Sequence, residues 1–313
     1  MNNGIVLSFA SELDHGNFGD LLSRYVVEKL SGRKINKYNY DVTAQHLCAI
    51  GSILNRNEIC SQALVWGSGF MSPQKTYKIM LTSIRQRLLG KFGRPTFYAV
   101  RGKKTRDILL AAGYDCPPVY GDPALVMPIL YKPKLCSIKN RMGIILHGKH
   151  EEETPSFLEN ATKFGGVIRI PVKREYKNIT DFIDEVCSCS FIVSSSLHGL
   201  IIANAYGVPA VRLTIEGHSV HPSKNDRFRQ NFKFDDYLSG LNALAIDKNI
   251  TEYKFPTFVL GEKEKLTENL IDEMEKSAMK PAFNWSIERL VSVFPFLQSE
   301  NNKKEPPERL PRI

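Results

Sequence analysis

The stretch Phe191-Ile-Val-Ser-Ser-Ser-Leu-His-Gly-Leu-Ile-Ile-Ala-Asn-Ala-Tyr-Gly-Val-Pro-Ala-Val-Arg212 decides the fold of this chain. It predicts a short apolar strand, a polar turn at residues 194–196 and a helix that begins near Leu197. A Gly-Val-Pro break then ends the helix, and the next strand is expected at residues 210–213. A strand, turn, helix and strand of this size form a βαβ crossover, the building unit of a parallel sheet.

Polar residues gather at the turn of this crossover, namely Ser194, Ser195, Ser196 and His198. In open parallel sheets, ligands bind at the carboxyl ends of strands, beside the N-termini of the following helices. Unpaired backbone N–H groups and the helix dipole favour an anion there, and a histidine adds a group that titrates near neutral pH. The turn therefore predicts an anion-binding site with acid–base capacity, with a histidine that only caps the helix as the alternative.

Length and composition indicate a globular protein with two cores. The chain has 313 residues, of which 42% are hydrophobic and 10% aromatic, and chains of this length usually divide into two domains. No apolar run reaches the roughly 18 residues that a membrane helix needs, and the N-terminus lacks the pattern of a signal peptide. The six cysteines show no zinc-binding spacing. We expect a cytoplasmic protein with reduced thiols and no metal.

The net charge of +9 favours anionic partners. Lysine and arginine are dispersed along the chain, and no known nucleic-acid motif occurs, so we do not expect nucleic acid as a partner. A phosphorylated substrate fits this charge better. An anionic membrane surface fits it as well, so peripheral contact with the inner face of the cell membrane is an alternative expectation.

Strands and helices alternate in both halves of the chain, which predicts an α/β protein. A basic, proline-containing linker is expected at residues 132–141, between the two series of elements. We therefore predict two Rossmann-like, doubly wound domains that face each other across a cleft. The expected divisions are an N-terminal domain at residues 1–131, a C-terminal domain at 142–260, closing helices at 261–297 and a mobile tail at 298–313.

The first half carries polar residues at comparable strand ends. Asn17 and Asp20 lie in a glycine-containing turn before a predicted helix, and Gly67 and Ser68 follow a buried strand. Turn formation and helix capping are the structural alternatives for these residues. Arg101 ends another strand, where its planar guanidinium group can grip a phosphate or carboxylate. An ordinary surface arginine is the alternative.

Six short segments occur in an order that resembles the polysaccharide pyruvyl transferase family, over roughly residues 14–240. Because Ser196 stands where many members have arginine, the chain is most similar to the succinoglycan ketal-forming branch. The six segments are Asn17-Phe-Gly-Asp20, Gly67-Ser-Gly69, Val100-Arg101, Gly121-Asp-Pro-Ala-Leu125, Ser194-Ser-Ser-Leu-His-Gly199 and Phe232-Lys-Phe-Asp-Asp-Tyr237.

The resemblance implies a fold like that of the GT-B glycosyltransferases. It also implies transfer of an enolpyruvyl unit from phosphoenolpyruvate to a sugar of a bacterial surface or exopolysaccharide glycan, which can be lipid-linked. Phosphate is released, and no metal or other cofactor is needed. His198 matches the histidine of the family's Leu-His-Gly turn, and we expect it to be the catalytic residue. The expected donor-binding residues are Arg101, Ser194, Ser195, Ser196, His147, Lys149 and Arg212, and the expected acceptor-side residues are Asn17, Asp20, Gly67 and Ser68.

A mechanism follows from these residue types. We expect His198 to deliver a proton to the methylene carbon of the donor, and Asp20 or Asp14 to act as a base towards the acceptor. One alternative is a GT-B glycosyltransferase that uses a nucleotide sugar and holds its ribose through Glu216 or Asp226. The other alternative is a glycan-binding protein that has lost donor binding. It stays open because Ser196 stands where many family members have an arginine.

Overall fold

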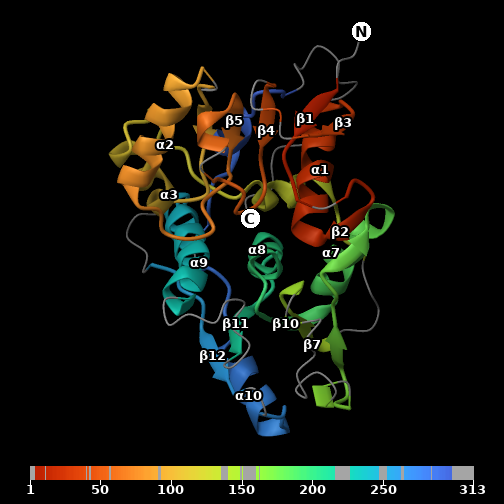
Figure 1. Ribbon diagram of the computed structural model, residues 1–313. Helices are drawn as coiled ribbons and strands as arrows, with labels where there is room; N and C mark the ends of the chain where they lie inside the picture. Colours follow the sequence, from red (N-terminus) through yellow and green to blue (C-terminus); the bar gives the residue numbers. More distant parts are fainter. Residues whose placement is uncertain are drawn as a thin grey trace.

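The computed structural model describes most of the chain (Figure 1). For residues 226–230 it describes the backbone only. The described residues are 4–10, 12–39, 41, 44–55, 58–90, 93–134, 140–148, 150, 160–161, 163–215, 226–246, 252–261, 264–282 and 284–297.

The first half of the chain forms a five-stranded parallel sheet in the order β3-β1-β4-β5-β6. Short runs of apolar residues build its central strands, and all residues of β4 and β5 are buried, as expected where helices cover a sheet. The strands are β1 (Ile5–Leu7), β3 (Ile35–Lys37), β4 (His46–Cys48), β5 (Ala63–Trp66) and β6 (Thr96–Ala99). The helices are α1 (Phe18–Ser31), η1 (Glu58–Cys60), α2 (Thr76–Leu88), α3 (Lys103–Ala111), η2 (Pro123–Val126) and α4 (Met127–Leu130).

The second half forms another five-stranded parallel sheet, in the order β12-β11-β10-β7-β8. Its strands are β7 (Asn140–Ile145), β8 (Val167–Arg169), β10 (Cys189–Ser194), β11 (Ala210–Ile215) and β12 (Thr257–Leu260). Its helices are η3 (Tyr176–Asn178), α7 (Ile179–Cys187), α8 (Leu197–Ala205), α9 (Asp226–Ala243), α10 (Glu268–Ser277) and α11 (Glu288–Ser292). Both sheets together confirm the predicted mixed α/β class, and they are compatible with two Rossmann-like domains.

The two halves are joined by a small antiparallel pairing that no pattern in the sequence indicated. Strand β2 (His15–Asn17) pairs with β9 (Lys173–Glu175), and the Phe18 N–H donates to the Val172 carbonyl at 2.7 Å. Next to this ladder, the ring of Phe18 stacks on that of Phe182 with a centroid separation of 3.7 Å. The turn before α1 is thereby attached to the second half of the chain.

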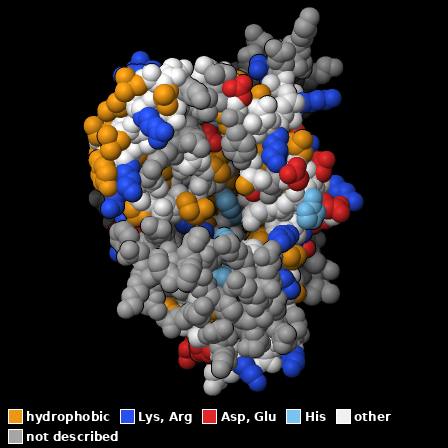
Figure 2. All heavy atoms as spheres, in the orientation of Figure 1, with side chains coloured by type: hydrophobic (Ala, Val, Ile, Leu, Met, Phe, Trp, Pro, Cys, Tyr) orange, Lys and Arg blue, Asp and Glu red, His pale blue; other side chains and the backbone are white. Residues whose placement is uncertain are grey.

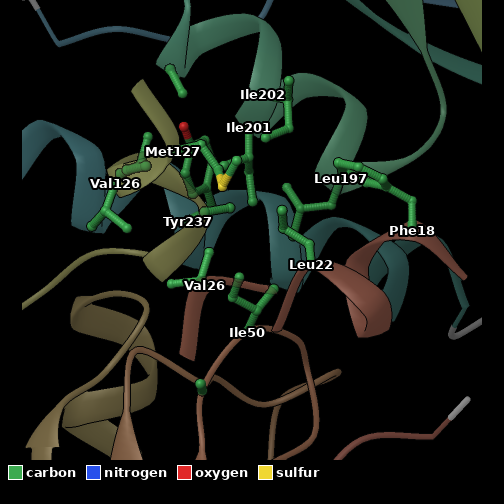
Figure 3. Packing of buried hydrophobic residues seen from close by; sticks show 14 of the residues in the cluster. Phe18, Leu22, Val26, Ile50, Val126, Met127, Leu197, Ile201, Ile202 and Tyr237 are labelled. Atoms are coloured by element: carbon green, nitrogen blue, oxygen red, sulfur yellow. The ribbon is translucent and has the colours of Figure 1, made fainter. Parts of the chain in front are cut away.

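One hydrophobic cluster continues across the boundary between the halves. Figure 3 shows Leu197, Ile201 and Ile202 of α8 above Leu22 of α1, with Val126 of η2 to their left. Burial of side chains of this size stabilises a protein by about 1.5–3 kcal/mol each. The start of α8 is therefore held against α1, and this contact positions the serine turn.

The predicted crossover is confirmed, because β10, α8 and β11 follow each other as expected and α8 begins at Leu197. Sequence reasoning did not predict β2, β9 or the long helix α9. The tail at 298–313 lies outside the described residues, as do 135–139 of the expected linker. The domain boundaries, the cleft and the GT-B-like arrangement stay predictions. In the part of the chain that is described, no helix combines the length and the apolar character needed to cross a bilayer.

Candidate active site

The three serines of the turn have different roles. The Ser194 hydroxyl lies 2.9 Å from the Ile145 carbonyl and accepts from the Ser196 N–H at 3.0 Å, so it fixes the turn to β7. The Ser195 hydroxyl accepts from the His147 N–H at 2.9 Å and lies 3.0 Å from Nδ1 of His150. Ser196 is the N-cap of α8 but makes no side-chain cap hydrogen bond. The first N–H groups of α8 thus have no side-chain cap, and this favours a bound anion.

His198 lies in the first turn of α8 and contacts the other half of the chain. A Cβ atom placed on Gly19, at the start of α1, would lie 2.2 Å from Nδ1 of His198, so the ring fits only against a glycine. The side chain is half-buried. Its Nε2 is buried and has no hydrogen-bond partner among the described residues. Buried polar atoms in native proteins almost always have a partner, so this nitrogen is a candidate ligand contact.

The surroundings of His198 are cationic. Burial lowers the pKa of His198 to about 3, and the charges of Lys233, Arg101 and His147 act in the same direction. The imidazole is therefore neutral at pH 7 in this structure.

Two further cations lie beside the ring of Phe234. Burial lowers the pKa of Lys233 to about 8, with Arg101 and Arg212 contributing. The Lys233 ammonium lies 5.3 Å from the ring centroid of Phe234, and the Arg212 guanidinium lies 3.9 Å from it. Nε of Arg212 is buried without a partner in the described structure. Mutually repelling cations with unsatisfied atoms form a site suited to a multiply charged anion.

Arg101 has a structural role that its position in the sequence did not indicate. The residue is fully buried, and its guanidinium forms an ion pair with Asp236 of α9, with Nη2 and Oδ2 at 3.0 Å. The remaining N–H groups donate to the Ser52 hydroxyl at 2.5 Å and the Phe70 carbonyl at 2.6 Å. The positive charge of Arg101 therefore helps to lower the pKa of His198 and of Lys233. Its hydrogen bonds hold α9 against the first half of the chain.

The neighbouring glycine motifs contribute to the same packing. A Cβ at Gly67, where φ is +86°, would lie 2.3 Å from Cδ of Pro123. A Cβ at Gly102 would lie 1.7 Å from the Asp236 carbonyl oxygen, and one at Gly240 would lie 2.0 Å from the Arg101 carbonyl oxygen. The buried Ser68 hydroxyl donates to the Ala49 carbonyl at 2.5 Å. Gly102 and Gly240 therefore pack where α9 meets the first half, whereas Gly67 and Ser68 pack within the first half.

The remaining acceptor-side candidates lie nearer to His198. Asn17 is the N-cap of α1, its side chain accepts from the Gly19 N–H at 3.1 Å, and it therefore lies beside the residue that the His198 ring contacts. Asp20 is half-buried in the first turn of α1. Asp14 is 87% exposed and pairs with Arg24, so its carboxylate is engaged away from the turn. Lys149, Glu216 and the Asp226 side chain lie outside the described residues.

The structure adds two residues to the site, His150 and Lys233. His150 is buried against Ser195, with its ring centroid 5.9 Å from that of His147. The sequence signal for His150 was its position soon after a strand end, in the run His147-Gly-Lys-His150. Lys233 lies within the segment Phe232-Lys-Phe-Asp-Asp-Tyr237. Nothing in that segment distinguishes a lysine that faces His198 from one that faces solvent.

Two other groups of buried polar side chains come from the first half of the chain. Burial raises the pKa of Asp122 to about 6, and its Oδ2 has no partner among the described residues. His46, Cys48 and Glu58 bring metal-binding atom types within 4.8 Å of one another. Glu58 accepts hydrogen bonds from Ser8 at 3.1 Å and lies 2.6 Å from His46 Nε2. These hydrogen bonds give the cluster of His46, Cys48 and Glu58 a structural role, which is to link β4 to η1.

A pocket of about 370 Å³ lies between α9 and the edge of the second sheet. Arg212 lines it together with Asp235 and Lys254, whereas His198 and the serine turn do not. The pocket therefore shares one cation with the site but does not contain the histidine.

Comparisons with known proteins identify the family of this chain. The family model for polysaccharide pyruvyl transferase matches residues 11–217, which include α1, Arg101 and the serine turn. An uncharacterized protein, L143, of Acanthamoeba polyphaga mimivirus is 25% identical over 230 residues, which cover 71% of this chain and 70% of that protein. No solved structure matches the chain.

The two parallel sheets are compatible with Rossmann-like domains, in which ligands bind at strand ends beside helix N-termini. The chain belongs to the polysaccharide pyruvyl transferase family and is a transferase. Its family role is the transfer of pyruvyl groups to polysaccharide.

Proposed function

We propose that this transferase takes its pyruvyl group from phosphoenolpyruvate and attaches it as a cyclic ketal to two hydroxyls of a glycan sugar. The observation that carries the proposal is the buried Nε2 of His198, which has no partner in the described structure and lies among cations beside the uncapped start of α8. Phosphoenolpyruvate supplies the phosphate and carboxylate that such a site favours. The nucleotide-sugar alternative depends on Glu216 and Asp226, whose side chains lie outside the described residues.

The donor itself supplies the charge that activates His198. A neutral imidazole is too weak an acid to protonate carbon, but an anion placed beside it favours the imidazolium form and raises its pKa. Donor binding therefore brings a proton onto His198. The imidazolium then protonates the methylene carbon, and an oxocarbenium-like centre forms at the adjacent carbon.

The rest of the reaction balances without a cofactor. One sugar hydroxyl attacks the oxocarbenium-like carbon and loses its proton to the neutral imidazole. The second hydroxyl attacks the same carbon, the bond to phosphate breaks, and the released phosphate takes up the second hydroxyl proton. Lys233 and Arg212 stabilise the negative charge that grows on the departing phosphate.

The direct test is product analysis with phosphoenolpyruvate and a panel of glycans. We expect one inorganic phosphate for each glycan that gains the mass of pyruvate less one water. His198→Gln should form both products at least about 100-fold more slowly while still melting cooperatively. Activity with a UDP-sugar and none with phosphoenolpyruvate would contradict the proposal.

A second test addresses the coupling between donor and proton. Calorimetric titration with phosphoenolpyruvate at pH 7, in two buffers of different ionisation enthalpy, should show net proton uptake on binding. The uptake should disappear in His198→Gln. Donor binding with no proton uptake in the unmodified protein would contradict this role of His198.

A further inference from the structure

Helix α2 presents an apolar face to solvent. Leu88 is 82% exposed and Leu81 is 60% exposed. Tyr77, Met80 and Ile84 are also about half-exposed, and together with Leu81 and Leu88 they follow the spacing of one face of a helix. Only Ile79 of this helix is buried, so the helix is attached to the protein by a narrow edge. Figure 2 shows hydrophobic side chains gathered over this region, at the upper left of the molecule.

Positive charge surrounds this apolar face. Lys75, Lys78, Arg85 and Arg87 are all exposed on or beside α2. Every charged residue between positions 59 and 106 is a lysine or an arginine. An exposed apolar stripe bordered only by cations is the pattern of a helix that lies in the interface of an anionic bilayer.

We propose that α2 docks this protein on the surface of a bilayer that contains anionic lipids. The stripe formed by Tyr77, Met80, Leu81, Ile84 and Leu88 enters the boundary between headgroups and acyl chains. The surrounding lysines and arginines contact the phosphate groups. Burial of the stripe and attraction of the cations act together, because a membrane accepts both kinds of surface on the same side.

The charge distribution argues against a second copy of the chain as the occupant. Symmetric dimers bring the same patch of both subunits together. Such contact at α2 would set Lys78 and Arg85 of one copy against the same cations of the other, and residues 59–106 include no acidic residue to pair with them. The proposal is independent of the donor chemistry, since it needs neither His198 nor phosphoenolpyruvate.

Vesicle binding of the full chain tests the proposal. Sedimentation with vesicles of phosphatidylglycerol and phosphatidylethanolamine should retain the protein, whereas vesicles of phosphatidylcholine should retain far less of it. Raising the salt concentration should weaken the binding because the lipid charges are screened. Equal partition to both kinds of vesicle, or to neither, would overturn the proposal.

Two variants separate the apolar and the charged contributions. Leu81→Ser/Ile84→Ser/Leu88→Ser should lower the partition coefficient about tenfold or more, and Lys78→Glu/Arg85→Glu should lower it by a similar factor. The matched control is Lys276→Glu/Lys280→Glu, which changes the net charge equally at two exposed lysines of the second half. It should retain nearly full binding.

The two variants change only exposed residues, so their melting temperatures should match that of the unmodified protein. Turnover with water-soluble substrates should also be unchanged, because α2 lies outside the serine turn. If the control lost as much binding as Lys78→Glu/Arg85→Glu, net charge would explain the binding and the docking role of α2 would be wrong. A monomer–dimer shift in the variants with unchanged vesicle binding would identify the face as a contact between copies.

Discussion

Two charged groups at the boundary between the halves differ in how completely they are satisfied. In one group, Arg101 and Asp236 are fully buried, and every polar atom of both side chains has a partner. In the other, His198 and Arg212 are half-buried, and each has a buried nitrogen with no partner in the described structure. Arg101, Asp236 and His198 come from the same ordered series of sequence segments, and Arg212 ends the crossover at residues 191–212.

The difference separates residues that hold the interface from residues that bind a ligand. A buried ion pair with all its hydrogen bonds in place has little capacity for an additional anion, and removal of one partner leaves an uncompensated charge. An unsatisfied cationic group has the opposite property, because a bound anion supplies the missing partners. We therefore expect mutations in the first group to change stability and those in the second to change binding and turnover.

The largest effect is expected at His198. His198→Gln and His198→Ala should lose about 100- to 10,000-fold in turnover, the usual contribution of an acid–base group. Donor affinity should fall much less. The melting temperature, measured on the same samples, should stay close to that of the unmodified protein. A stable variant with full activity would leave His198 as a structural cap of α8.

The next effect is a loss of stability in the satisfied group. Asp236→Asn should lower the free energy of unfolding by about 3–5 kcal/mol, because it leaves the Arg101 charge buried without a counter-charge. Asp235→Asn is the matched control, since its neighbour Asp235 is 48% exposed and pairs with Lys104 at 3.8 Å. The control should change stability by less than about 1 kcal/mol. Equal losses in urea titrations of the two variants would contradict the assignment.

Gly19→Ala tests whether the interface positions His198. The new Cβ would overlap the imidazole, so the ring must move away from α1. A displacement on the scale of 1 Å can lower turnover about a hundredfold. Gly165→Ala is the control, because nothing lies within 4 Å of a Cβ at that exposed position. Rates of phosphate release should fall only for Gly19→Ala, and equal rates would contradict the contact.

Lys233 should contribute to donor affinity and not to the stability of the interface. Lys233→Met removes a cation that repels its neighbours, so we expect it to raise the dissociation constant for phosphoenolpyruvate about 10- to 100-fold. Its melting temperature should stay the same or rise. Lys177→Met is the control at a 75% exposed lysine, and it should bind the donor normally. Unchanged donor affinity in Lys233→Met, measured calorimetrically, would remove this residue from the site.

The smallest effect is the pH dependence of donor binding. Because the pKa of Lys233 is lowered to about 8, the lysine is protonated below this pH and loses its charge above it. The dissociation constant for phosphoenolpyruvate should therefore rise above pH 8, by less than tenfold for each pH unit. Lys233→Arg keeps its charge throughout this range, so its profile should be less steep and should contain only the rise that comes from proton uptake at His198. An equally steep rise in that variant would assign the dependence to another group.

The sequence predicted the parts of the fold that depend on local patterns. Runs such as Ala63–Trp66 and Thr96–Ala99 were recognisable because a buried parallel strand is apolar and bounded by turn residues. The start of α8 at Leu197 followed from a polar turn before an apolar helix. Helix α7 likewise follows a local pattern, because its buried side chains, Ile179, Phe182, Ile183 and Val186, recur at helical spacing.

Contacts between distant segments could not be read in the same way. Strand β9 is Lys173-Arg-Glu175, which has no strand-like alternation, and it forms only because β2 offers a free edge. Arg101 and Asp236 are 135 positions apart, and neither shows locally that the other will neutralise it. The residues that flank an arginine at a strand end do not show whether its partner will be a ligand or a distant aspartate.

The sequence by itself determined the α/β class, the crossover at Phe191–Arg212 and the family, because these depend on short-range patterns and on the order of segments. The tertiary structure alone decided which motif residues hold the halves together and which leave a polar atom without a partner. The physical reason is that the state of a charged side chain depends on burial and on the groups packed against it. Those groups come from elements such as α1 and α9, which reach the serine turn only when the chain has folded.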